Sequence, residues 1–289
     1  MNAKIIAILM ASIVAMAIAV PMAMGDHDPV ADTSVSVGNA PPGVCAKWEE
    51  PDDQPETPDT TEVMPNQHPN NKTVTIKACV CDPNGEDDIA RVTATVTGPA
   101  GFTPVTVTLT RDPATDPECE PYTCPTGIVE CLQYDGTFDM GPCDPAGMYT
   151  VTVTVTDQAG ETGSMENTFE YLSLIAMTAG DVAFGSVAPG GSSTASSTIT
   201  VYGNDKIKFD DADPAGYDNP DDNDGIYWSD MTSGVNTIAD DQITTTWDPT
   251  TCIDGCLGTA NVPFTLDVPA GTQQGSYGGT ITFTPSHCP

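Results

Sequence analysis

The stretch that decides the fold is residues 149–164, Tyr149-Thr-Val-Thr-Val-Thr-Val-Thr-Asp-Gln-Ala-Gly-Glu-Thr-Gly-Ser164. Tyr149 and the valines at 151, 153 and 155 alternate with four threonines. Because successive side chains of a strand point to opposite faces, the pattern predicts one buried face and one solvated face. The Asp-Gln-Ala-Gly that follows has the composition of a turn, and we interpret it as hairpin geometry rather than a metal-binding or catalytic loop. The stretch predicts an antiparallel strand in an all-β fold.

The region around this stretch contains further short alternating runs. Apolar faces are expected from Val74, Ile76, Ala78 and Val80, and from Ala90, Val92, Ala94 and Val96. Turns rich in Gly, Pro and Asp separate the runs, which is typical of a β-sandwich. The predicted strands are residues 73–81, 89–97, 105–110, 127–134, 148–157 and 164–171.

Two motifs of this region resemble a known family. Ala146-Gly-Met-Tyr-Thr-Val-Thr-Val-Thr-Val-Thr-Asp-Gln-Ala-Gly-Glu-Thr-Gly163 resembles the closing hairpin of immunoglobulin-like and PKD-like domains on archaeal and bacterial cell-surface proteins. Cys81-Asp-Pro-Asn-Gly-Glu-Asp-Asp-Ile89 resembles an early turn of such domains. The Trp-Asp/Phe-Gly-Asp-Gly signature of strict PKD domains is missing, so the resemblance supports the broader immunoglobulin-like class. It implies an architecture for residues 72–172 and no particular activity.

Residues 173–289 resemble a second immunoglobulin-like class of surface proteins. The resemblance rests on Asp181-Val-Ala-Phe-Gly-Ser-Val-Ala-Pro-Gly190 with residues 196–202, and on the closing run 268–283. The fold class expected for the whole chain is therefore all-β, with two tandem immunoglobulin-like antiparallel β-sandwiches, stapled by disulfides. The residues expected to face inward in the second sandwich are Val262, Phe264, Leu266, Val268, Tyr277, Ile281 and Phe283.

The first 25 residues have the pattern of a secretory signal peptide. Lys4 is their only charge, residues 5–20 are apolar, and Pro21 and Ala23 suit a cleavage site. The apolar run is shorter than the ~20 residues that a membrane-spanning helix needs, which favours cleavage over anchoring. The sequence has no second apolar run, so we expect an extracellular or cell-surface protein with no membrane span in the mature chain.

Residues 26–71 are rich in proline and acid and are expected to form an extended N-terminal segment and linker. One patch within it, Thr33-Ser-Val-Ser-Val37, alternates like a short strand. It could pair with a strand of its own domain. It could instead pair with a neighbouring subunit and add main-chain hydrogen bonds to that subunit's sheet.

The charge of the chain excludes several classes of partner. Eight basic and 41 acidic residues give a formal net charge of −33. Nucleic acid and anionic lipid need Lys and Arg to neutralise phosphate, so neither is an expected partner. An acidic surface suits divalent cations, high salt or solubility.

All ten cysteines follow the predicted signal, which in an exported chain indicates disulfides. Cys79 and Cys81 point away from their strand's apolar face and are expected to staple loops over the outer surface. Residues 26–172 hold seven cysteines and residues 173–289 hold three, so intrachain pairing of all ten requires at least one bridge between the regions. The cysteines are Cys45, Cys79, Cys81, Cys119, Cys124, Cys131, Cys143, Cys252, Cys256 and Cys288.

The pairing itself stays open. Cys252 and Cys256 can close a small loop, leaving Cys288 for Cys45 or another distant thiol. A bridge between subunits is the other possibility. A zinc site from Cys252, Cys256, His287 and Cys288 is conceivable by ligand type, but export favours disulfides.

Calcium is the ligand that the acidic loops suit best, because this ion takes six to eight oxygen ligands. The sequence requires no cofactor, and calcium is the one ion that we consider as a bound ligand. Of the two acidic loops, the one in the second half of the chain resembles the start of an EF-hand, but Pro220 occupies the first ligand position. Acidic runs more often only solvate a surface, which is the competing interpretation. The candidate ligands are Asp82, Asn84, Glu86 and Asp88 in one loop, and Asp221, Asp222 and Asp224 in the other.

No catalytic residue is assigned from the sequence. The histidines, at 27, 68 and 287, lie outside the predicted strands, so a nucleophile–histidine pair is not supported. Trp228 and Trp247 are the best sugar-stacking candidates, although tryptophans are more often core residues. Asn71-Lys72-Thr73 is a glycosylation sequon.

These features together favour a non-enzymatic extracellular structural protein, a subunit of a surface layer, sheath or filament. Its expected partners are other copies of itself or other cell-surface proteins, with Thr33–Val37 as the donor strand. The chain ends after its last predicted strand without a sorting motif, so attachment to the cell is expected to be non-covalent or through partners. The first alternative is a calcium-dependent adhesin or ligand-binding surface module. A secreted hydrolase with a shallow carboxylate site is the least favoured.

Overall fold

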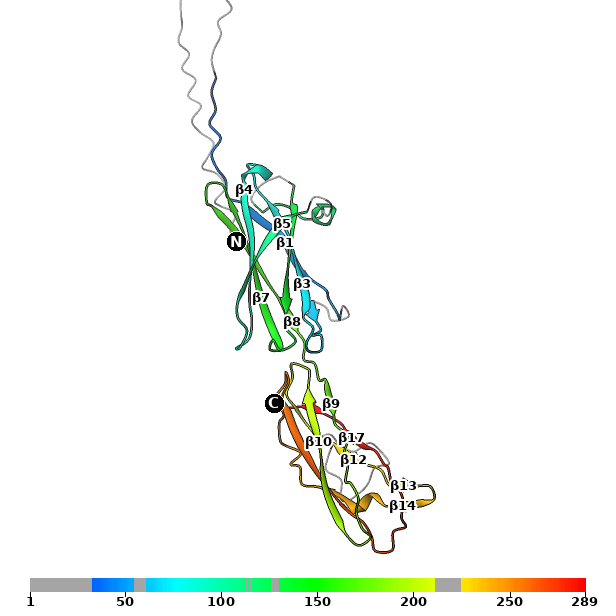
Figure 1. Ribbon diagram of the computed structural model, residues 1–289. Helices are drawn as coiled ribbons and strands as arrows, with labels where there is room; N and C mark the ends of the chain where they lie inside the picture. The colour runs from blue at the N-terminus through cyan, green and yellow to red at the C-terminus, as the bar shows by residue number, and fades with distance from the viewer. Residues whose placement is uncertain (1–32, 55–60, 113, 115, 126–129, 211–224) are drawn as a thin grey trace, which may run out of the picture. The chain divides into compact units, whose positions relative to one another are not determined.

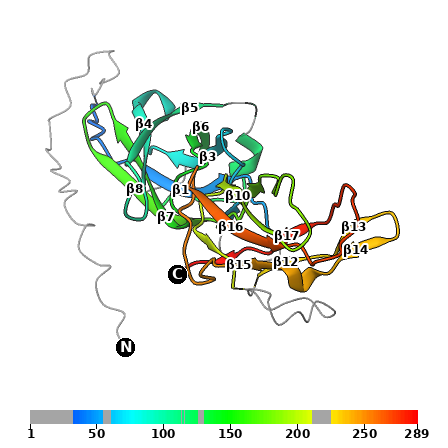
Figure 2. The same cartoon turned by 60° about the horizontal axis from the view of Figure 1, so that its bottom comes forward.

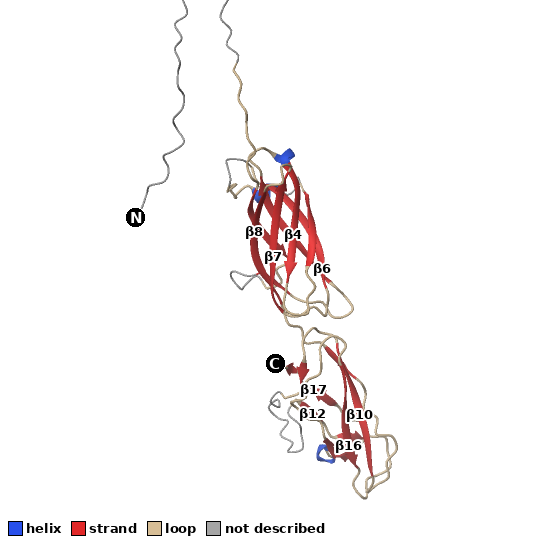
Figure 3. Ribbon diagram, turned by 90° about the vertical axis from the view of Figure 1, so that its left-hand side faces the viewer, coloured by secondary structure: helices blue, strands red, loops and turns tan. Residues whose placement is uncertain are grey.

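The computed structural model describes residues 33–54, 61–112, 114, 116–125, 130–210 and 225–289. The chain divides into two units, residues 1–38 and 39–289. Residues 33–38 of the first unit form no strand, and Val35 and Val37 are 90% and 82% exposed. The second unit is all-β, as predicted (Figure 1). Its described helices are three short 3₁₀ turns, drawn blue in Figure 3: η1 (Glu86–Asp88), η2 (Asp116–Cys119) and η3 (Asp240–Gln242).

The first part of this unit is an eight-stranded sheet with the order β1-β3-β6-β5-β4-β7-β8-β2. Neighbouring strands are antiparallel except β2 and β8. β5 pairs along most of its length with β4 but reaches β6 at Thr110 and Arg111, its last two residues, so the sheet folds into two layers there. The strands are β1 (Gly43–Glu50), β2 (Thr61–Val63), β3 (Lys72–Cys81), β4 (Ile89–Thr97), β5 (Val105–Arg111), β6 (Leu132–Met140), β7 (Gly147–Asp157) and β8 (Thr162–Tyr171).

One hydrophobic core fills the space between these layers. Tyr149 and the three valines of β7 are fully buried in it, as the opening stretch predicts. The ring of Tyr149 stacks on Phe169 of β8, with centroids 5.2 Å apart. The expected inner face of β3 is also fully buried, at Val74, Ile76, Ala78 and Val80.

The prediction of the inner face of β4 is wrong at one residue, Ala90. The register between β4 and β7 shifts between Ile89 and Arg91, which makes a β-bulge at Ala90. A bulge adds one residue to a strand and so changes which side chain faces inward. Ala90 is exposed as a result, and Ile89 packs against the core in its place.

Threonines line the outer face of the same layer in rows across the strands. Thr95 of β4 lies between Thr106 of β5 and Thr152 of β7. Thr93 lies between Thr108 and Thr154 in the same way. β-Branched side chains suit a pleated surface, and cross-strand threonine pairs stabilise it.

Two tyrosines each donate a hydrogen bond to the turn that precedes them. Tyr149 donates a hydrogen bond to the carbonyl oxygen of Pro145, four residues upstream, at 2.7 Å. Tyr277 donates to the carbonyl oxygen of Gln273, also four residues upstream, at 2.9 Å. Gly147, two residues before Tyr149, has φ 132°, a conformation that favours glycine.

The remaining strands surround a second core. A four-stranded sheet has the order β15-β16-β10-β9, with β10 and β16 side by side in Figure 2. Phe264 and Trp228 pack edge to face in its core, with centroids 6.0 Å apart. The strands are β9 (Met177–Ala179), β10 (Ser192–Val201), β11 (Ile207–Lys208), β12 (Ile226–Trp228), β13 (Met231–Ser233), β14 (Asn236–Ile238), β15 (Ile243–Thr245), β16 (Thr259–Asp267), β17 (Ile281–Phe283) and β18 (Ser286–His287). β11 pairs with β18, β12 with β17 and β13 with β14.

The inner residues predicted for the second core lie where they were expected. Val262, Phe264, Leu266 and Val268 are buried. Tyr277, Ile281 and Phe283 are partly buried and pack against the same cluster.

Two strand predictions need correction. Residues 43–50 and 61–63 were expected within an extended linker, but they form β1, which pairs with β3, and β2, which pairs with β8. The pattern of β1 was hidden because this strand carries Lys47 and Glu49 on its buried face. The strand predicted at 127–134 begins later and runs further, as β6 (Leu132–Met140). Residues 126–129 lie outside the described ranges.

All ten cysteines form disulfides within the chain. Cys79 and Cys81 bind Cys119 and Cys124, so they staple the loop after β5 over the outer face, as predicted. The expected bridge between residues 26–172 and 173–289 is also present. The pairs are Cys45–Cys131, Cys79–Cys119, Cys81–Cys124, Cys143–Cys256 and Cys252–Cys288.

Two of the pairing alternatives and the zinc site are wrong. Cys252 bonds to Cys288 rather than Cys256, and Cys45 bonds to Cys131 rather than Cys288. The zinc site is excluded because disulfide bonds use all three of its thiols. No helix in the described part of the chain is long and apolar enough to cross a bilayer. The predicted signal peptide lies outside the described residues.

Candidate cation site

Three carboxylates meet at one end of the first core. Asp82 follows β3, Asp88 ends η1, and Asp157 ends β7. Each offers an oxygen that lies within 4.8 Å of the other two. The turns after β3 and β7 therefore place three acidic groups together, although they lie far apart along the chain.

Asp82 is the buried member of this cluster. Its side chain is 3% exposed. One carboxylate oxygen accepts a hydrogen bond from the backbone N–H of Asn84 at 2.7 Å. Its other oxygen, Oδ2, is buried without a hydrogen-bond partner among the described residues. Burial raises the pKa of Asp82, and the negative charges of Asp88 and Asp157 raise it further.

Asp157 is held in place by hydrogen bonds on both oxygens. Oδ2 accepts from the side-chain amide of Asn39 at 2.7 Å, and Oδ1 accepts from the backbone N–H of Glu161 at 2.7 Å. The hydrogen bond from Asn39 is the main reason that the pKa of Asp157 is lowered. The cluster thus combines a fixed, ionised carboxylate with a buried one whose negative charge is poorly compensated. A hard cation such as Ca²⁺ would supply the missing positive charge.

Only part of the first set of predicted ligands lies in the acidic cluster. Asp82 and Asp88 come together as expected. The side-chain oxygen of Asn84 instead accepts a hydrogen bond from the backbone of Ala40 at 2.8 Å. Glu86 forms an ion pair with Arg111 at 3.0 Å and lies outside the cluster. The second predicted set, Asp221, Asp222 and Asp224, lies outside the described residues.

Asp157 was missed as a candidate ligand. We interpreted its turn as hairpin geometry alone, and the bond from Glu161 does close that hairpin. The same carboxylate also belongs to the acidic cluster. Strand pairing is the signal that would have found Asp157. Antiparallel pairing of 89–97 with 148–157 sets Ile89 opposite Asp157, and Ile89 is next to Asp88.

The serine, aspartate and histidine that meet near the end of the described chain do not form a catalytic triad. His287 Nδ1 lies 2.8 Å from Asp205 Oδ2, and the hydroxyl of Ser173 donates to the same carboxylate. The carboxylate therefore lies between serine and histidine, whereas a catalytic triad needs the histidine in the middle. Trp228 is a buried core residue whose indole N–H donates to the carbonyl oxygen of Asp240 at 2.9 Å. Trp247 is partly buried and packs near Phe209.

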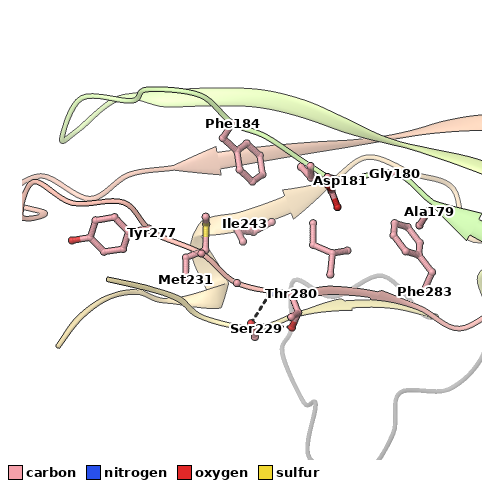
Figure 4. A pocket seen from close by; sticks show the side chains of 14 residues that line it. Ala179, Gly180, Asp181, Phe184, Ser229, Met231, Ile243, Tyr277, Thr280 and Phe283 are labelled. Carbon is pink, nitrogen blue, oxygen red and sulfur yellow. Dashed lines mark hydrogen bonds between the residues drawn. The ribbon is translucent and has the colours of Figure 1, made fainter. Parts of the chain in front are cut away.

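The second core is hollowed by a cavity of about 420 Å³, shown in Figure 4. Apolar side chains from residues 182–184, β15 and β17 line it, including Phe184, Ile243 and Phe283. Among the described residues that line it, Asp181 is the one acidic residue. Glycoside hydrolysis requires two carboxyl groups across the bond to be cleaved, so the described lining does not supply that pair.

Neither a family model nor a curated protein matches the chain. Among solved structures, a chaperone–tip adhesion subunit complex of archaic Csu pili from Acinetobacter baumannii is 12% identical, with 78% of this chain and 97% of that chain covered and a TM-score of 0.30. The C-terminal domain of the polypeptide BspA from Streptococcus agalactiae is 10% identical, with coverage of 86% and 98% and a TM-score of 0.25. The secreted serine protease VesC from Vibrio cholerae is 9% identical, with coverage of 85% and 50% and a TM-score of 0.23. Likeness at this level assigns no function to the chain.

Proposed function

We propose that this chain is an extracellular structural protein that assembles with other copies of itself at the cell surface by strand addition. The observation that carries the proposal is the state of Thr33–Val37. The segment alternates as a strand does, and its two valines are almost fully exposed in a chain that otherwise buries its valine-rich strands. Exposed alternating apolar residues are a template for pairing with another chain.

The second part of the proposal is that both halves belong to the immunoglobulin-like class. The hydrogen bond of Tyr149 to Pro145 has the geometry of the tyrosine corner that recurs in such sandwiches. Tyr277 repeats that geometry in the second half. Export is supported by the five disulfides, because oxidising compartments favour such bonds.

We assign the cavity of the second core as the acceptor for Thr33–Val37 of a second copy. Apolar side chains line part of it, Val182, Phe184 and Ile281 among them, beside the polar groups of Asp181, Ser229 and Thr280. A strand that lays Val35 and Val37 on one face would place both valines in the cavity and leave Ser34 and Ser36 toward solvent. The two valines have no comparable apolar cover in the described chain, since both are exposed.

The test compares two double variants of the same segment. Val35→Asp with Val37→Asp places charge on the face that enters the cavity, so oligomers should be lost in sedimentation velocity. Ser34→Asp with Ser36→Asp adds the same charge to the opposite face and should assemble like the parent chain. Equal assembly of all three proteins would rule out strand addition by this segment.

A second candidate function is calcium-dependent adhesion, with the ion holding the loops at one end of the first core. The buried oxygen Oδ2 of Asp82 supports it, since a bound cation would give this atom a partner. Asn71 is exposed just before β3, which suits its proposed glycosylation. Calcium-dependent binding of cells or glycans by the purified chain, lost on chelation, would favour adhesion over assembly.

A further inference from the structure

The buried face of β1 carries two charged side chains where apolar ones are expected. The register with β3 shifts between Val44 and Ala46, which is a bulge at Cys45. Beyond it Lys47 lies opposite Ala78 and Glu49 opposite Ile76, both members of the first core. The side chains of Lys47 and Glu49 are 1% and 0% exposed.

A side-chain amide from the other layer completes the group. Asn167 lies on β8 opposite the buried Val151, so it shares the inward face. Lys47 Nζ donates to Glu49 Oε1 at 2.6 Å and also contacts the side-chain oxygen of Asn167. The amide nitrogen of Asn167 donates to the other oxygen of Glu49, Oε2, at 2.9 Å. The carboxylate of Glu49 thus accepts hydrogen bonds from both Lys47 and Asn167, and the side-chain oxygen of Asn167 faces the amine of Lys47.

The surroundings favour an uncharged amine. Burial lowers the pKa of Lys47, against the raising effect of Glu49. Moving the proton from the ammonium group to the carboxylate would leave a neutral amine and a carboxylic acid in the apolar core. A desolvated neutral lysine is a nucleophile, and the side-chain oxygen that Nζ contacts is bonded to an electrophilic amide carbon, Cγ of Asn167.

We propose that Lys47 and Asn167 condense into an intramolecular amide cross-link, with Glu49 as the proton-transfer group. Nζ forms a bond to Cγ of Asn167, and the bond from Cγ to Nδ2 breaks. Glu49 takes a proton from the amine and delivers a proton to Nδ2, which leaves as ammonia. The products are one secondary amide and one ammonia molecule, and no oxidant or other reactant is needed.

An ordinary buried ion pair explains this group less well. Burying two charges has a large desolvation cost, and such pairs often add little stability. An ion pair of Lys47 with Glu49 also does not explain Asn167. The nitrogen of this amide donates to Glu49, and its oxygen faces the amine of Lys47. Condensation removes the buried charge of Lys47 and joins β1 to β8 covalently. The inference does not depend on the proposed strand addition.

Mass spectrometry of the reduced and alkylated full chain tests the proposal. The folded protein should be lighter than its sequence by the mass of one ammonia molecule. Asn84-Gly85 could also lose ammonia by closing to a succinimide, so the loss must be located. A branched peptide joining the Lys47 and Asn167 segments is the expected product. Recovery of both residues unmodified in separate peptides would overturn the proposal.

Variants separate the roles of the three residues. Asn167→Ala should abolish the branched peptide because it removes the electrophile. Glu49→Gln should also abolish it while keeping both reacting groups, since the amide cannot take the proton. Glu50→Gln is the matched control, since Glu50 follows on the same strand, is exposed, and pairs with Lys77. The control should form the cross-link fully, and its failure there would count against the assigned role of Glu49.

Discussion

The carboxylate of Asp157 lies within 4.8 Å of that of Asp82, although Asp157 ends β7 and Asp82 follows β3, a strand of the other layer of the first sandwich. β3, which leads to Asp82, belongs with β1 and β6, and β7, which leads to Asp157, lies between β4 and β8. A cation bound here would hold the two layers together at that end. Without one, like charges oppose each other at the same point.

The substitution Asp82→Asn tests whether carboxylate repulsion and a bound cation have these opposite effects on stability. The amide keeps the shape of the carboxyl group but removes the charge, so we expect a higher Tm in chelator than for the parent chain. It also removes a cation ligand, so the rise in Tm on adding calcium should disappear. Differential scanning fluorimetry with calcium and with chelator measures both effects.

Glu86→Gln is the control for this experiment. Glu86 lies in the same acidic loop but pairs with Arg111 outside the cluster. Its replacement should leave the calcium-induced shift unchanged. A parent chain whose Tm does not respond to calcium would remove the basis for the cation site.

The same carboxyl group predicts a pH dependence of stability. The pKa of Asp82 is raised in the folded protein, so the folded state binds this proton more tightly than the unfolded chain. Its contribution to stability is therefore present at acid pH and is lost as the pH rises through the raised pKa. In chelator, the free energy of unfolding of the parent relative to Asp82→Asn should fall over this range. A difference that stays constant with pH would contradict the assignment.

Tyr149→Phe should destabilise the first sandwich by about 1 kcal/mol, the usual net value of one hydrogen bond. The substitution removes the bond to the Pro145 carbonyl but keeps the ring that stacks on Phe169. Urea unfolding measures the change. Tyr122→Phe, at an exposed ring, is the matched control and should have little effect.

The bridge between Cys143 and Cys256 predicts a specific cleavage pattern. Trypsin cuts after Lys206 and Lys208 divide the chain between these cysteines, and the other four disulfides lie wholly on one side of the cuts. In denaturant without reductant, the C-terminal fragment should stay attached to the rest. In the variant Cys143→Ser with Cys256→Ser it should separate. Release of that fragment from the unreduced parent would show that the bridge is absent.

Much of the strand pattern could be predicted from the sequence because a buried valine face repeats with period two. The prediction of 148–157 and 89–97 as strands succeeded for this reason. β1 was missed because its inward side chains include Lys47 and Glu49, which make a buried strand look like an acidic linker. The two charged residues that broke the apolar pattern of β1, Lys47 and Glu49, are also the two that the proposed cross-link uses on this strand.

The candidate site was predicted less completely. Asp82 and Asp88 share one loop, so their spacing along the chain was informative. Asp157 joins them through the pairing of β4 with β7, a relationship between distant segments that a single loop does not reveal. The disulfide partners could not be predicted either. An odd number of cysteines in each half requires a bridge between the halves, but it does not show which cysteines form that bridge.

Negative-stain electron microscopy of the purified chain is the most direct test of assembly through Thr33–Val37. We expect filaments or sheets with a regular repeat, and their loss in the variant Val35→Asp with Val37→Asp. Separate single particles of the parent chain at every concentration tested would contradict assembly through this segment.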